Sequence, residues 1–347
     1  MRRLAACALA VAAAGGAIGC GGDDGGGNGT ATAQTATTAT GGTLAQVPGI
    51  VKKVQPSVVT VISTLPQGQG EGAGVAWSPH VVVTNNHVVE NATSVRVVLA
   101  GGRRVDAKVR ATDPRRDLAL VEVDGADLPP ATFAGQVPDV GSLAVAIGSP
   151  LGFEQSVTAG IISGVDRAIP SGGRTPALVG LLQTDAAISP GNSGGALVDA
   201  DGRVVGINVA YIPPQGGAVS LGFAIPSPTV RTVVPDLLDD GHAANPYLGI
   251  RSVPLTPGEA QQLGVSSDHG LVVLQVEPGS PADDAGLQGG DVLLTAAGQR
   301  LDALEDLYSV MAKHRPGDRL DLQVLRDGDQ RSLTVTLGER PTTATTG

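Results

Sequence analysis

Short runs of β-branched and aliphatic residues recur along most of this chain, and they restrict its possible folds more than any other feature. From residue 47 to residue 210 the runs include "SVVTVIST", "HVVVTN", "SVRVVLA", "DLALVEVD", "SLAVAIG" and "RVVGINVA", separated by turns rich in Gly, Pro and Asp. Strands of this length at such regular intervals indicate an all-β sandwich or barrel rather than alternating β-α-β units. The chain has 347 residues, of which 41% are hydrophobic, enough for two domains with their own cores.

Changes in composition divide the chain. Residues 21–46 are mostly Gly, Ala and Thr, too polar and simple to bury a core, and are expected to form a disordered tether. A helix is expected from Ser227 to Leu238, and the segment "LLDDGHAANP" that overlaps its end separates a first β domain, 47–240, from a second, 245–340. A disordered tail, 341–347, is expected to follow.

The first 20 residues have the layout of an export signal, with two arginines ahead of an apolar stretch. The stretch is shorter than the roughly 20 apolar residues that span a bilayer, which disfavours an uncleaved anchor. Gly19-Cys20 resembles the lipobox of bacterial lipoproteins, although Ala17 stands where a lipobox usually has Leu. We therefore expect export to the outer face of the cytoplasmic membrane or the periplasm, with Cys20 as a lipid anchor; plain secretion is the alternative.

Charge and composition exclude several classes of function. The net charge of -10 argues against binding to nucleic acid and against an electrostatic attachment to anionic lipid. The five histidines fall in unrelated segments and no carboxylate cluster has the spacing of metal ligands, so no metal site is expected. No nucleotide-binding loop is visible either, and no cofactor is expected.

Ser193 lies among glycines in "ISPGNSGGALVDADGRVVGINVA", a sequence in which a serine is either a nucleophile or part of a tight turn. The pentapeptide "GNSGG" fits the G-x-S-x-G pattern of α/β-hydrolases, in which a helix follows the serine and the acid and histidine lie downstream. Here strand-like runs follow instead, and the downstream histidines fall in the linker and the second domain. The α/β-hydrolase interpretation is therefore rejected.

A serine nucleophile on an all-β scaffold needs a histidine base and an orienting carboxylate upstream, because its hydroxyl is a poor nucleophile at neutral pH. His87 follows a strand in "VVVTNNHVVENA", and Asp117 precedes an apolar run in "DPRRDLALVEV". Asp113, four residues earlier, is the competing carboxylate.

The motifs "TNNHVV", "DLALVEV" and "QTDAAISPGNSGGALVD", in this order, closely resemble the HtrA family of serine proteases, and the resemblance covers residues 48–340. It implies a mainly β protein, with a chymotrypsin-like double β-barrel protease domain followed by a PDZ domain. It also implies a catalytic triad, with His87 as general base and acid, Asp117 as the residue that orients it, and Ser193 as the nucleophile.

The same resemblance assigns an oxyanion hole to Gly191, Asn192 and Ser193, with the N–H groups of the first and last as donors. Trypsin-type enzymes have Asp at the position of Asn192, where it pairs with a newly cut N-terminus, so activation by propeptide cleavage is not expected here. Loop rearrangement at the oxyanion turn is expected instead. Arg167 is the nearest match to the loop arginine that takes part in this rearrangement in the family; otherwise it is a solvated loop charge.

Substrate-binding residues follow from the resemblance as well. Ile188 is expected at the base of the S1 pocket, and the strand at Asn208, Val209 and Ala210 is expected to pair with the substrate backbone. An apolar floor without a carboxylate favours small aliphatic residues such as Val or Ala at P1 and disfavours Lys or Arg.

The second domain resembles a PDZ domain of the HtrA type, which binds an extended C-terminus as an added strand. The loop that receives the carboxylate is expected at "YLGI", Tyr247, Leu248, Gly249 and Ile250, unless this is an ordinary strand start. Leu248 and Ile250 are expected to line an apolar pocket with the face of a helix, formed by Leu304, Leu307, Tyr308 and Met311.

The resemblance implies an ATP-independent serine endopeptidase for unfolded or damaged exported proteins, tethered or activated by C-terminal peptides. A chaperone or scaffold with little proteolysis is the alternative, and a dedicated regulatory protease is a third. HtrA proteases commonly form trimers through aromatic residues near the start of the protease domain. Because "LAQVPGIVKKVQPSVV" contains no aromatic residue, a homotrimer is left open.

Overall fold

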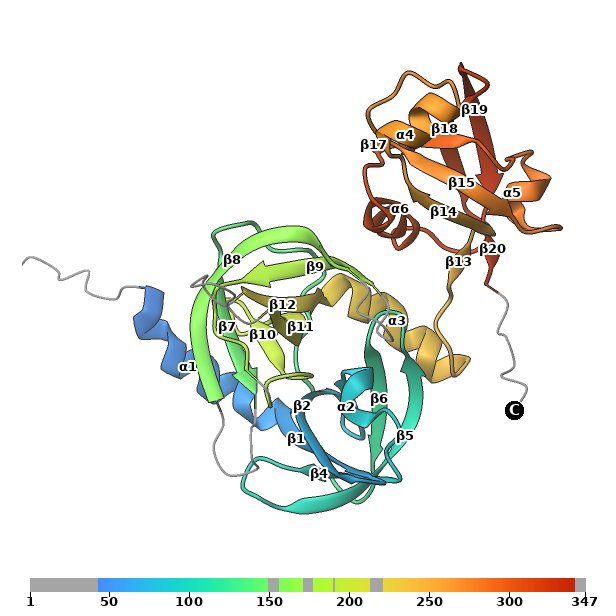
Figure 1. Ribbon diagram of the computed structural model, residues 1–347. Helices are drawn as coiled ribbons and strands as arrows, with labels where there is room; N and C mark the ends of the chain where they lie inside the picture. The colour runs from blue at the N-terminus through green and yellow to red at the C-terminus, as the bar shows by residue number, and fades with distance from the viewer. Residues whose placement is uncertain (1–42, 149–155, 171–176, 190, 213–220, 341–347) are drawn as a thin grey trace, which may run out of the picture. The chain divides into compact units, whose positions relative to one another are not determined.

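The computed structural model describes residues 43–148, 156–170, 177–189, 191–212 and 221–340, with side chains described except at 43 and 210–212. These residues form two closed β-barrels and a smaller sheet with three helices (Figure 1). The predicted mainly β, double-barrel fold is confirmed. Cys20, the export signal, the tail and all but the last four residues of the expected tether lie outside the described residues. Those four form a 3-10 helix, η1 (Thr43–Gln46), so the prediction of disorder is wrong there.

The first barrel closes in the strand order β1-β2-β3-β6-β5-β4, and every neighbouring pair is antiparallel. Its strands are β1 (Val58–Leu65), β2 (Gly68–Ser78), β3 (Val81–Thr84), β4 (Ser94–Val98), β5 (Arg104–Asp113) and β6 (Leu118–Val123). All four residues of β3 are buried, which explains why "VVVT" has no polar alternation. The short helix α2 (Asn86–Val89) begins two residues after this strand and carries His87.

The second barrel closes in the order β10-β11-β12-β9-β8-β7. Its strands are β7 (Leu143–Gly148), β8 (Ser156–Ile169), β9 (Leu178–Thr184), β10 (Ala196–Val198), β11 (Val204–Ile212) and β12 (Leu221–Pro226). Ser193 precedes β10, so the chain places the predicted nucleophile in the second barrel and the predicted base in the first.

Two longer helices pack against the barrels. The helix α1 (Val47–Val54) precedes β1, and α3 (Ser227–Asp239) follows β12, one residue longer than the predicted helix. Their apolar faces join a cluster that contains residues of both barrels, among them Val75, Leu118 and Ile207. Burial of a side chain of this size contributes about 1.5–3 kcal/mol, so this shared core stabilises the junction at which the two barrels meet.

The second domain is a sheet in the order β14-β15-β16-β18-β19, with β17 paired to β16 and a separate pair β13-β20. Its strands are β13 (Pro246–Tyr247), β14 (Ile250–Pro254), β15 (Leu271–Val276), β16 (Val292–Ala296), β17 (Gln299–Arg300), β18 (Arg319–Arg326), β19 (Asp329–Thr336) and β20 (Gly338–Glu339). Its helices are α4 (Pro257–Gln262), α5 (Pro281–Asp284) and α6 (Leu304–Met311). The strand β14 lies at the edge of this sheet.

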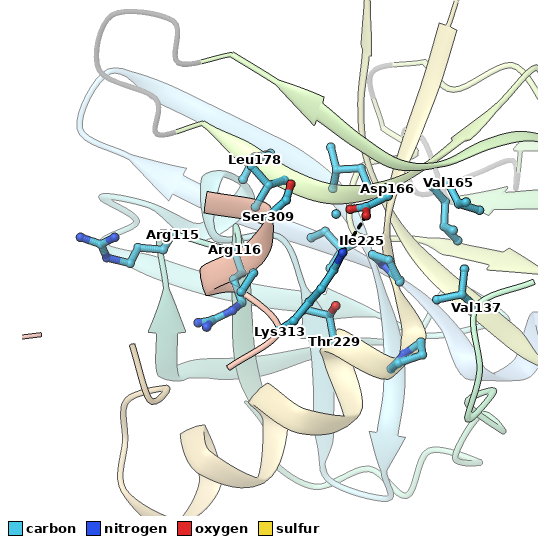
Figure 2. A pocket seen from close by; sticks show the side chains of 17 residues that line it. Arg115, Arg116, Val137, Val165, Asp166, Leu178, Ile225, Thr229, Ser309 and Lys313 are labelled. Atoms are coloured by element: carbon cyan, nitrogen blue, oxygen red, sulfur yellow. Dashed lines mark hydrogen bonds and ion pairs between the residues drawn. The ribbon is translucent and has the colours of Figure 1, made fainter. Parts of the chain in front are cut away.

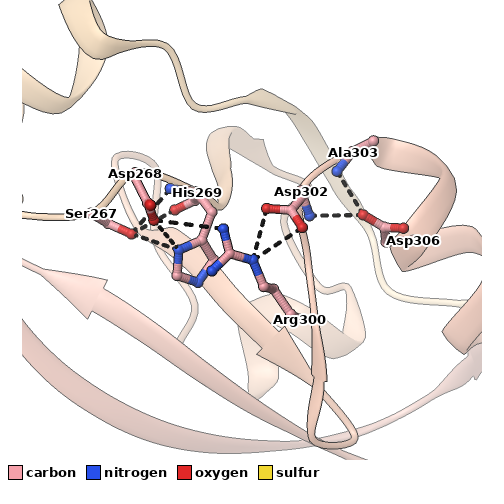
Figure 3. Close-up of polar contacts among 7 residues, drawn as sticks. All are labelled: Ser267, Asp268, His269, Arg300, Asp302, Ala303 and Asp306. Carbon is pink, nitrogen blue, oxygen red and sulfur yellow. Dashed lines mark hydrogen bonds and ion pairs between the residues drawn. The ribbon is translucent and has the colours of Figure 1, made fainter.

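The start of α6 is held by a carboxylate, as Figure 3 shows. One oxygen of Asp306 accepts the N–H groups of Asp302 at 2.7 Å and Ala303 at 2.8 Å, which orders the first turn. The predicted apolar face is partly wrong. Leu307 is buried, but Tyr308 is 45% exposed, and the buried residue on its C-terminal side is Val310. Helical periodicity alone allows either Tyr308 or Val310 to be buried. Packing against the sheet determines that Val310 is.

Candidate active site

His87 and Asp117 form a doubly bonded pair in the first barrel. The ring Nδ1 of His87 lies 2.6 Å from Oδ2 of Asp117, and the backbone N–H of His87 donates to Oδ1 at 2.9 Å. Because an ionised carboxylate only accepts hydrogen bonds, Nδ1 carries the proton and Nε2 is left as the acceptor. The Asp117 side chain is 11% exposed and the His87 side chain 46%, so the imidazole reaches solvent from a buried carboxylate.

The backbone of Asp117 is held by the segment that carries His87. Asp117 has φ 53°, a left-handed conformation that costs a non-glycine residue about 1–2 kcal/mol. Its carbonyl accepts the side-chain Nδ2 of Asn85 at 3.0 Å and the N–H of Asn86 at 3.1 Å. Asn85 is fully buried, and sequence reasoning missed it. The signal was its place two residues before the histidine in "TNNH".

Asp113, the competing carboxylate, has other partners. It accepts the N–H groups of Arg115 at 3.1 Å and Arg116 at 3.4 Å, and the guanidinium of Arg116 donates to its second oxygen at 2.7 Å. It therefore closes the turn that precedes Asp117. The structure brings Asp117, rather than Asp113, to the imidazole.

Ser193 lies at the junction of the two barrels. Its carbonyl accepts the N–H of Ala73 from β2 at 2.7 Å, and the carbonyl of Ala73 accepts the hydroxyl of Thr84 from β3 at 2.6 Å. A Cβ added to Gly72 would meet both the side chain of Val88, at 2.7 Å, and the carbonyl oxygen of Ser193, at 3.0 Å. The residue after His87 and the predicted nucleophile thus approach the same point.

The hydroxyl of Ser193 is bonded to a carbonyl in this structure. Its Oγ donates to the carbonyl of Val209 at 3.2 Å, and within the described ranges no hydrogen bond joins it to Nε2 of His87. Rotation about the Cα–Cβ bond exchanges one acceptor for another, and catalytic hydrogen bonds often form fully only with substrate bound.

The glycine turn before Ser193 presents backbone donors. Gly191 has φ 97°, and the N–H of Asn192 donates to the carbonyl of Ser189 at 2.9 Å. These are features of a type II turn, whose third residue needs a positive φ and is therefore usually glycine. Among the described residues, neither the N–H of Gly191 nor that of Ser193 has a backbone acceptor.

Asn192 does not contribute a donor, which corrects its assignment to the oxyanion hole. Its N–H is used within the turn, and the residue is only 1% exposed. A Cβ on Gly148 would lie 2.2 Å from its Oδ1, so this close contact depends on glycine. The role of Asn192 is to shape the turn.

The predicted substrate strand contains a bulge beside Ser193. Asn208 pairs with Ala224 and Ala210 pairs with Phe223, so Val209 is the extra residue. A bulge redirects the groups of the strand, and here the carbonyl of Val209 faces the serine hydroxyl. The side chains of Asn208 and Val209 are buried, which leaves the backbone of this strand as the group available to a peptide.

Ile188, predicted at the base of S1, is 4% exposed and packs in an apolar cluster of the second barrel. Gly222 on β12 lies against it, since a Cβ there would be 3.0 Å from Cδ1 of Ile188. Arg167 belongs to β8, where it pairs with Leu181, so its prediction as a loop residue is wrong. Its guanidinium covers Gly164 on the same strand.

The predicted carboxylate loop of the second domain differs in part from expectation. The hydroxyl of Tyr247 donates to Glu277, and the guanidinium of Arg340 lies 5.0 Å from the centroid of its ring. The hydrogen bond to Glu277 raises the pKa of Tyr247. Tyr247 and Leu248 are both buried. Leu248 packs in one apolar cluster with Leu307, and Ile250, Leu304 and Met311 pack against that cluster, which is the arrangement predicted for Leu248, Ile250 and the helix face.

The backbone of the same loop remains available. Gly249 has φ 86°, and its carbonyl is turned inward to the N–H of Glu277 at 2.9 Å. Within the described part of the chain, the N–H groups of Leu248 and Gly249 have no backbone acceptor. They stand at the start of β14, the edge strand, and Ile250 is partly buried beside them.

A hollow of about 370 Å³ lies away from the triad (Figure 2). Val165, Leu178 and Ile225 form apolar walls, and Arg116, Asp166 and Lys313 supply charges. His87, Asp117 and Ser193 are not among its lining residues. The candidate active site is therefore identified by the bonded groups described above rather than by the size of a cavity.

Comparisons with known proteins agree with this geometry. A family model described as a trypsin-like peptidase domain matches residues 72–207, and a PDZ domain model matches 246–337. A probable periplasmic serine endoprotease DegP-like of Marinomonas sp. (strain MWYL1) is 39% identical over 261 residues, which cover 75% of this chain and 55% of the relative. The chain thus spans about half the length of the DegP-like relatives it matches.

Other relatives are covered more completely. The putative serine protease HhoB of Synechocystis sp. is 39% identical over 287 residues, covering 80% of this chain and 68% of HhoB. The solved HtrA-type protease AlgW with a tripeptide has a TM-score of 0.69 and 36% identity, covering 85% of this chain and 97% of that chain. The serine endoprotease from Yersinia pestis has a TM-score of 0.62 and 31% identity, covering 85% and 98%.

Proposed function

Because the chain belongs to the HtrA family of serine proteases, we propose that it is an ATP-independent serine endopeptidase that cleaves unfolded or damaged exported proteins. One observation carries the proposal. A histidine bonded through Nδ1 to a buried carboxylate stands on one barrel. A serine stands where the other barrel meets it, in a turn with two N–H groups that have no backbone acceptor among the described residues.

These groups supply each part of acyl transfer. Nε2 of His87 takes the proton of the Ser193 hydroxyl as Oγ attacks the carbonyl carbon of the scissile peptide bond. The N–H groups of Gly191 and Ser193 bind the oxyanion, each contributing about 2.7–4 kcal/mol to the transition state. His87 then protonates the leaving amine as the peptide C–N bond breaks. In the second half, Nε2 of His87 takes a proton from water as the water oxygen attacks the acyl carbon, and returns it to Oγ of Ser193 as the ester bond breaks and the acid product leaves.

Pairing of a substrate with β11 prepares the nucleophile. The carbonyl of Val209 accepts the Ser193 hydroxyl in the ligand-free chain. A substrate strand beside β11 competes for this carbonyl and frees the hydroxyl for His87. The apolar contact of Ile188 with Gly222 leaves no charge at the base of S1, which supports small aliphatic residues at P1.

The second domain, 245–340, is the peptide-binding part of this proposal. The N–H groups of Leu248 and Gly249, which have no backbone acceptor within the described ranges, suit a terminal carboxylate, and the edge strand β14 suits an extended peptide backbone. A C-terminal peptide bound there either tethers a substrate or activates the protease domain, 47–240. A loop rearrangement at the oxyanion turn, in which Arg167 takes part, is the proposed form of activation.

Export and assembly complete the proposal. The DegP-like relatives are named as periplasmic, which supports a site outside the cytoplasm, and Cys20 is the proposed lipid anchor once cleavage after Gly19 makes it the N-terminal residue. A homotrimer is supported by exposed apolar residues on the second barrel, where Val157 and Ile161 of β8 are 36% and 42% exposed. Neither an anchor nor a trimer is needed for the chemistry above.

Ser193→Ala tests the central claim. We expect purified chain to react with a fluorophosphonate probe and to cleave casein, and the variant to do neither while it retains its thermal midpoint and binding of unfolded casein. A wild-type chain that leaves casein intact but suppresses aggregation of an unfolded protein as well as the variant does would favour the chaperone alternative. Mapping of cleavage sites checks P1, and mainly basic P1 residues would contradict the S1 assignment.

A further inference from the structure

Arg116 occupies the position directly before Asp117, yet its side chain points to the segment that leads into the second domain. Its Nη1 donates to Oδ1 of Asn245 at 3.2 Å and its Nη2 donates to the carbonyl of Ala244 at 3.2 Å. We propose that Arg116 is a positioning residue. It connects the turn that precedes the catalytic aspartate to the first residues of the peptide-binding domain, and the rate of proteolysis depends on this connection. This inference rests on the proposed serine protease function.

On the protease side, the guanidinium is part of the turn itself. It donates to Asp113 at 2.7 Å, and the side chains of Asp113 and Arg116 are only 2% and 18% exposed. Asp113 in turn accepts the backbone N–H groups of Arg115 and Arg116. A shift of the guanidinium therefore moves the backbone that leads into Asp117, whose left-handed conformation leaves little freedom to absorb the shift.

On the other side, Asn245 stands at the start of the second domain and is bonded to residues at the C-terminal end of that domain. Its N–H donates to the carboxylate of Glu339 at 3.0 Å, and its carbonyl accepts the N–H of Arg340 at 2.9 Å. The adjacent residues 246–247 form β13, which pairs with β20 at the C-terminal end of the domain. The start and the C-terminal end of the peptide-binding domain thus meet at Asn245, and Arg116 contacts this residue directly.

The chemistry of the guanidinium suits this bridge. A planar group with five N–H donors reaches Asp113, Asn245 and Ala244 at once, whereas the ammonium of a lysine is a single point charge. Arg115 carries the same charge one residue earlier, and partial burial together with the nearby charge of Arg340 lowers its pKa. Arg115→Met therefore removes a charge from the same turn without removing the hydrogen bonds of Arg116 to Asn245 and Ala244. Figure 2 draws both side chains, and that of Arg115 is exposed and has no hydrogen bond among the described residues.

The test is a double-mutant cycle in the full-length chain. Arg116→Met and Asn245→Ala are each expected to lower kcat for a peptide substrate about tenfold per fluorophosphonate-titrated site, with KM changed less than twofold. The double variant is expected to match the single variants, because both break one bridge. Asn245→Asp, which keeps an acceptor for Arg116, is expected to recover most of the rate, and Arg115→Met to leave it unchanged.

Three results would overturn the inference: wild-type kcat in Arg116→Met, losses that multiply in the double variant, or an equal loss in Arg115→Met. If Arg116→Met lowered the thermal midpoint or the fraction of titrated sites but kept kcat per site, Arg116 would contribute only to stability. That result would also overturn the inference.

Amide hydrogen exchange separates this inference from the proposed function. In the Ser193→Ala background, Asn245→Ala is expected to speed exchange in peptides that cover residues 113–118, and Arg115→Met is not. Unchanged exchange there would refute the bridge whether or not the wild-type chain is a protease. A wild-type chain without serine reactivity, but with faster exchange in Asn245→Ala, would refute the proposed function and leave the bridge supported.

Discussion

The His87–Asp117 pair and the Ser193 turn come from different barrels and differ in how far their polar groups are already bonded. Both oxygens of Asp117 are bonded to His87, and its carbonyl is bonded to Asn85 and Asn86. Around Ser193, by contrast, two N–H groups have no backbone acceptor among the described residues, and the hydroxyl is bonded to Val209 rather than His87. The acid–base half is assembled without substrate, and the nucleophile half keeps its donors free for one.

The largest loss of kcat is expected from a change in the acid–base half. Asp117→Asn places an NH₂ group opposite Nδ1 of His87 and forces the other tautomer, so kcat should fall about 10⁴-fold. Steady-state cleavage of a peptide substrate, with the fold checked by circular dichroism, measures it. Asp127→Asn is the matched control, because Asp127 also pairs with a histidine, His80 at 3.5 Å, but is 88% exposed. A loss of similar size in the control would contradict the special role of the buried pair.

The nucleophile half should respond to Gly191→Ala, which strains a residue at φ 97° and disturbs an oxyanion donor. Loss of one such donor corresponds to about 10²–10³ in kcat with little change in KM. Gly102→Ala is the control, since Gly102 has φ 86° and open space around its Cβ position. If the control lowered kcat as much as Gly191→Ala does, strain alone would account for the result.

Asn85→Ala tests whether the acid–base half, the His87–Asp117 pair, depends on the side chain of Asn85, which sequence reasoning missed. It removes one of two donors to the Asp117 carbonyl, so we expect about tenfold lower kcat, and about 1 kcal/mol less stability in urea unfolding. Ser63→Ala is a suitable comparison, because Ser63 is fully buried in the same barrel and its hydroxyl has no partner in the structure. Equal kcat in the two variants would show that the remaining donor, Asn86, suffices.

The smallest effect should lie outside both halves, at the peptide-binding loop. The hydrogen bond to Glu277 raises the pKa of Tyr247 above its usual 10.0. A raised pKa means that this bond stabilises the fold below pH 10 and that its contribution is lost as pH rises through the folded-state value. Thermal midpoints between pH 8 and 11 should therefore fall more in the wild type than in Tyr247→Phe, while kcat at pH 8 is the same in both. Parallel pH curves would argue against a contribution from this bond.

Local patterns in the sequence predicted the parts of the fold that depend on short-range chemistry. Runs of β-branched residues predicted the strands, and the helix expected from Ser227 ends within one residue of the observed end of α3. Periodicity failed at Tyr308, because a helix of eight residues offers more than one apolar face and only the sheet beneath it selects one. Arg167 was predicted in a loop only from the family resemblance, and the structure places it in the strand β8.

At the candidate site, the sequence by itself determined which side chains are chemically able to act: a histidine after a strand, an aspartate before one, and a serine whose glycines permit a turn with positive φ. Only the tertiary structure decided that Asn85 supports Asp117, that a bulge turns the carbonyl of Val209 to the serine, and that Arg116 reaches Asn245. These contacts join residues between 16 and 129 positions apart, and no local pattern reports them. Asn85 meets Asp117 within the first barrel and Ser193 meets Val209 within the second, because closure and packing of each barrel set the position of one strand end against another.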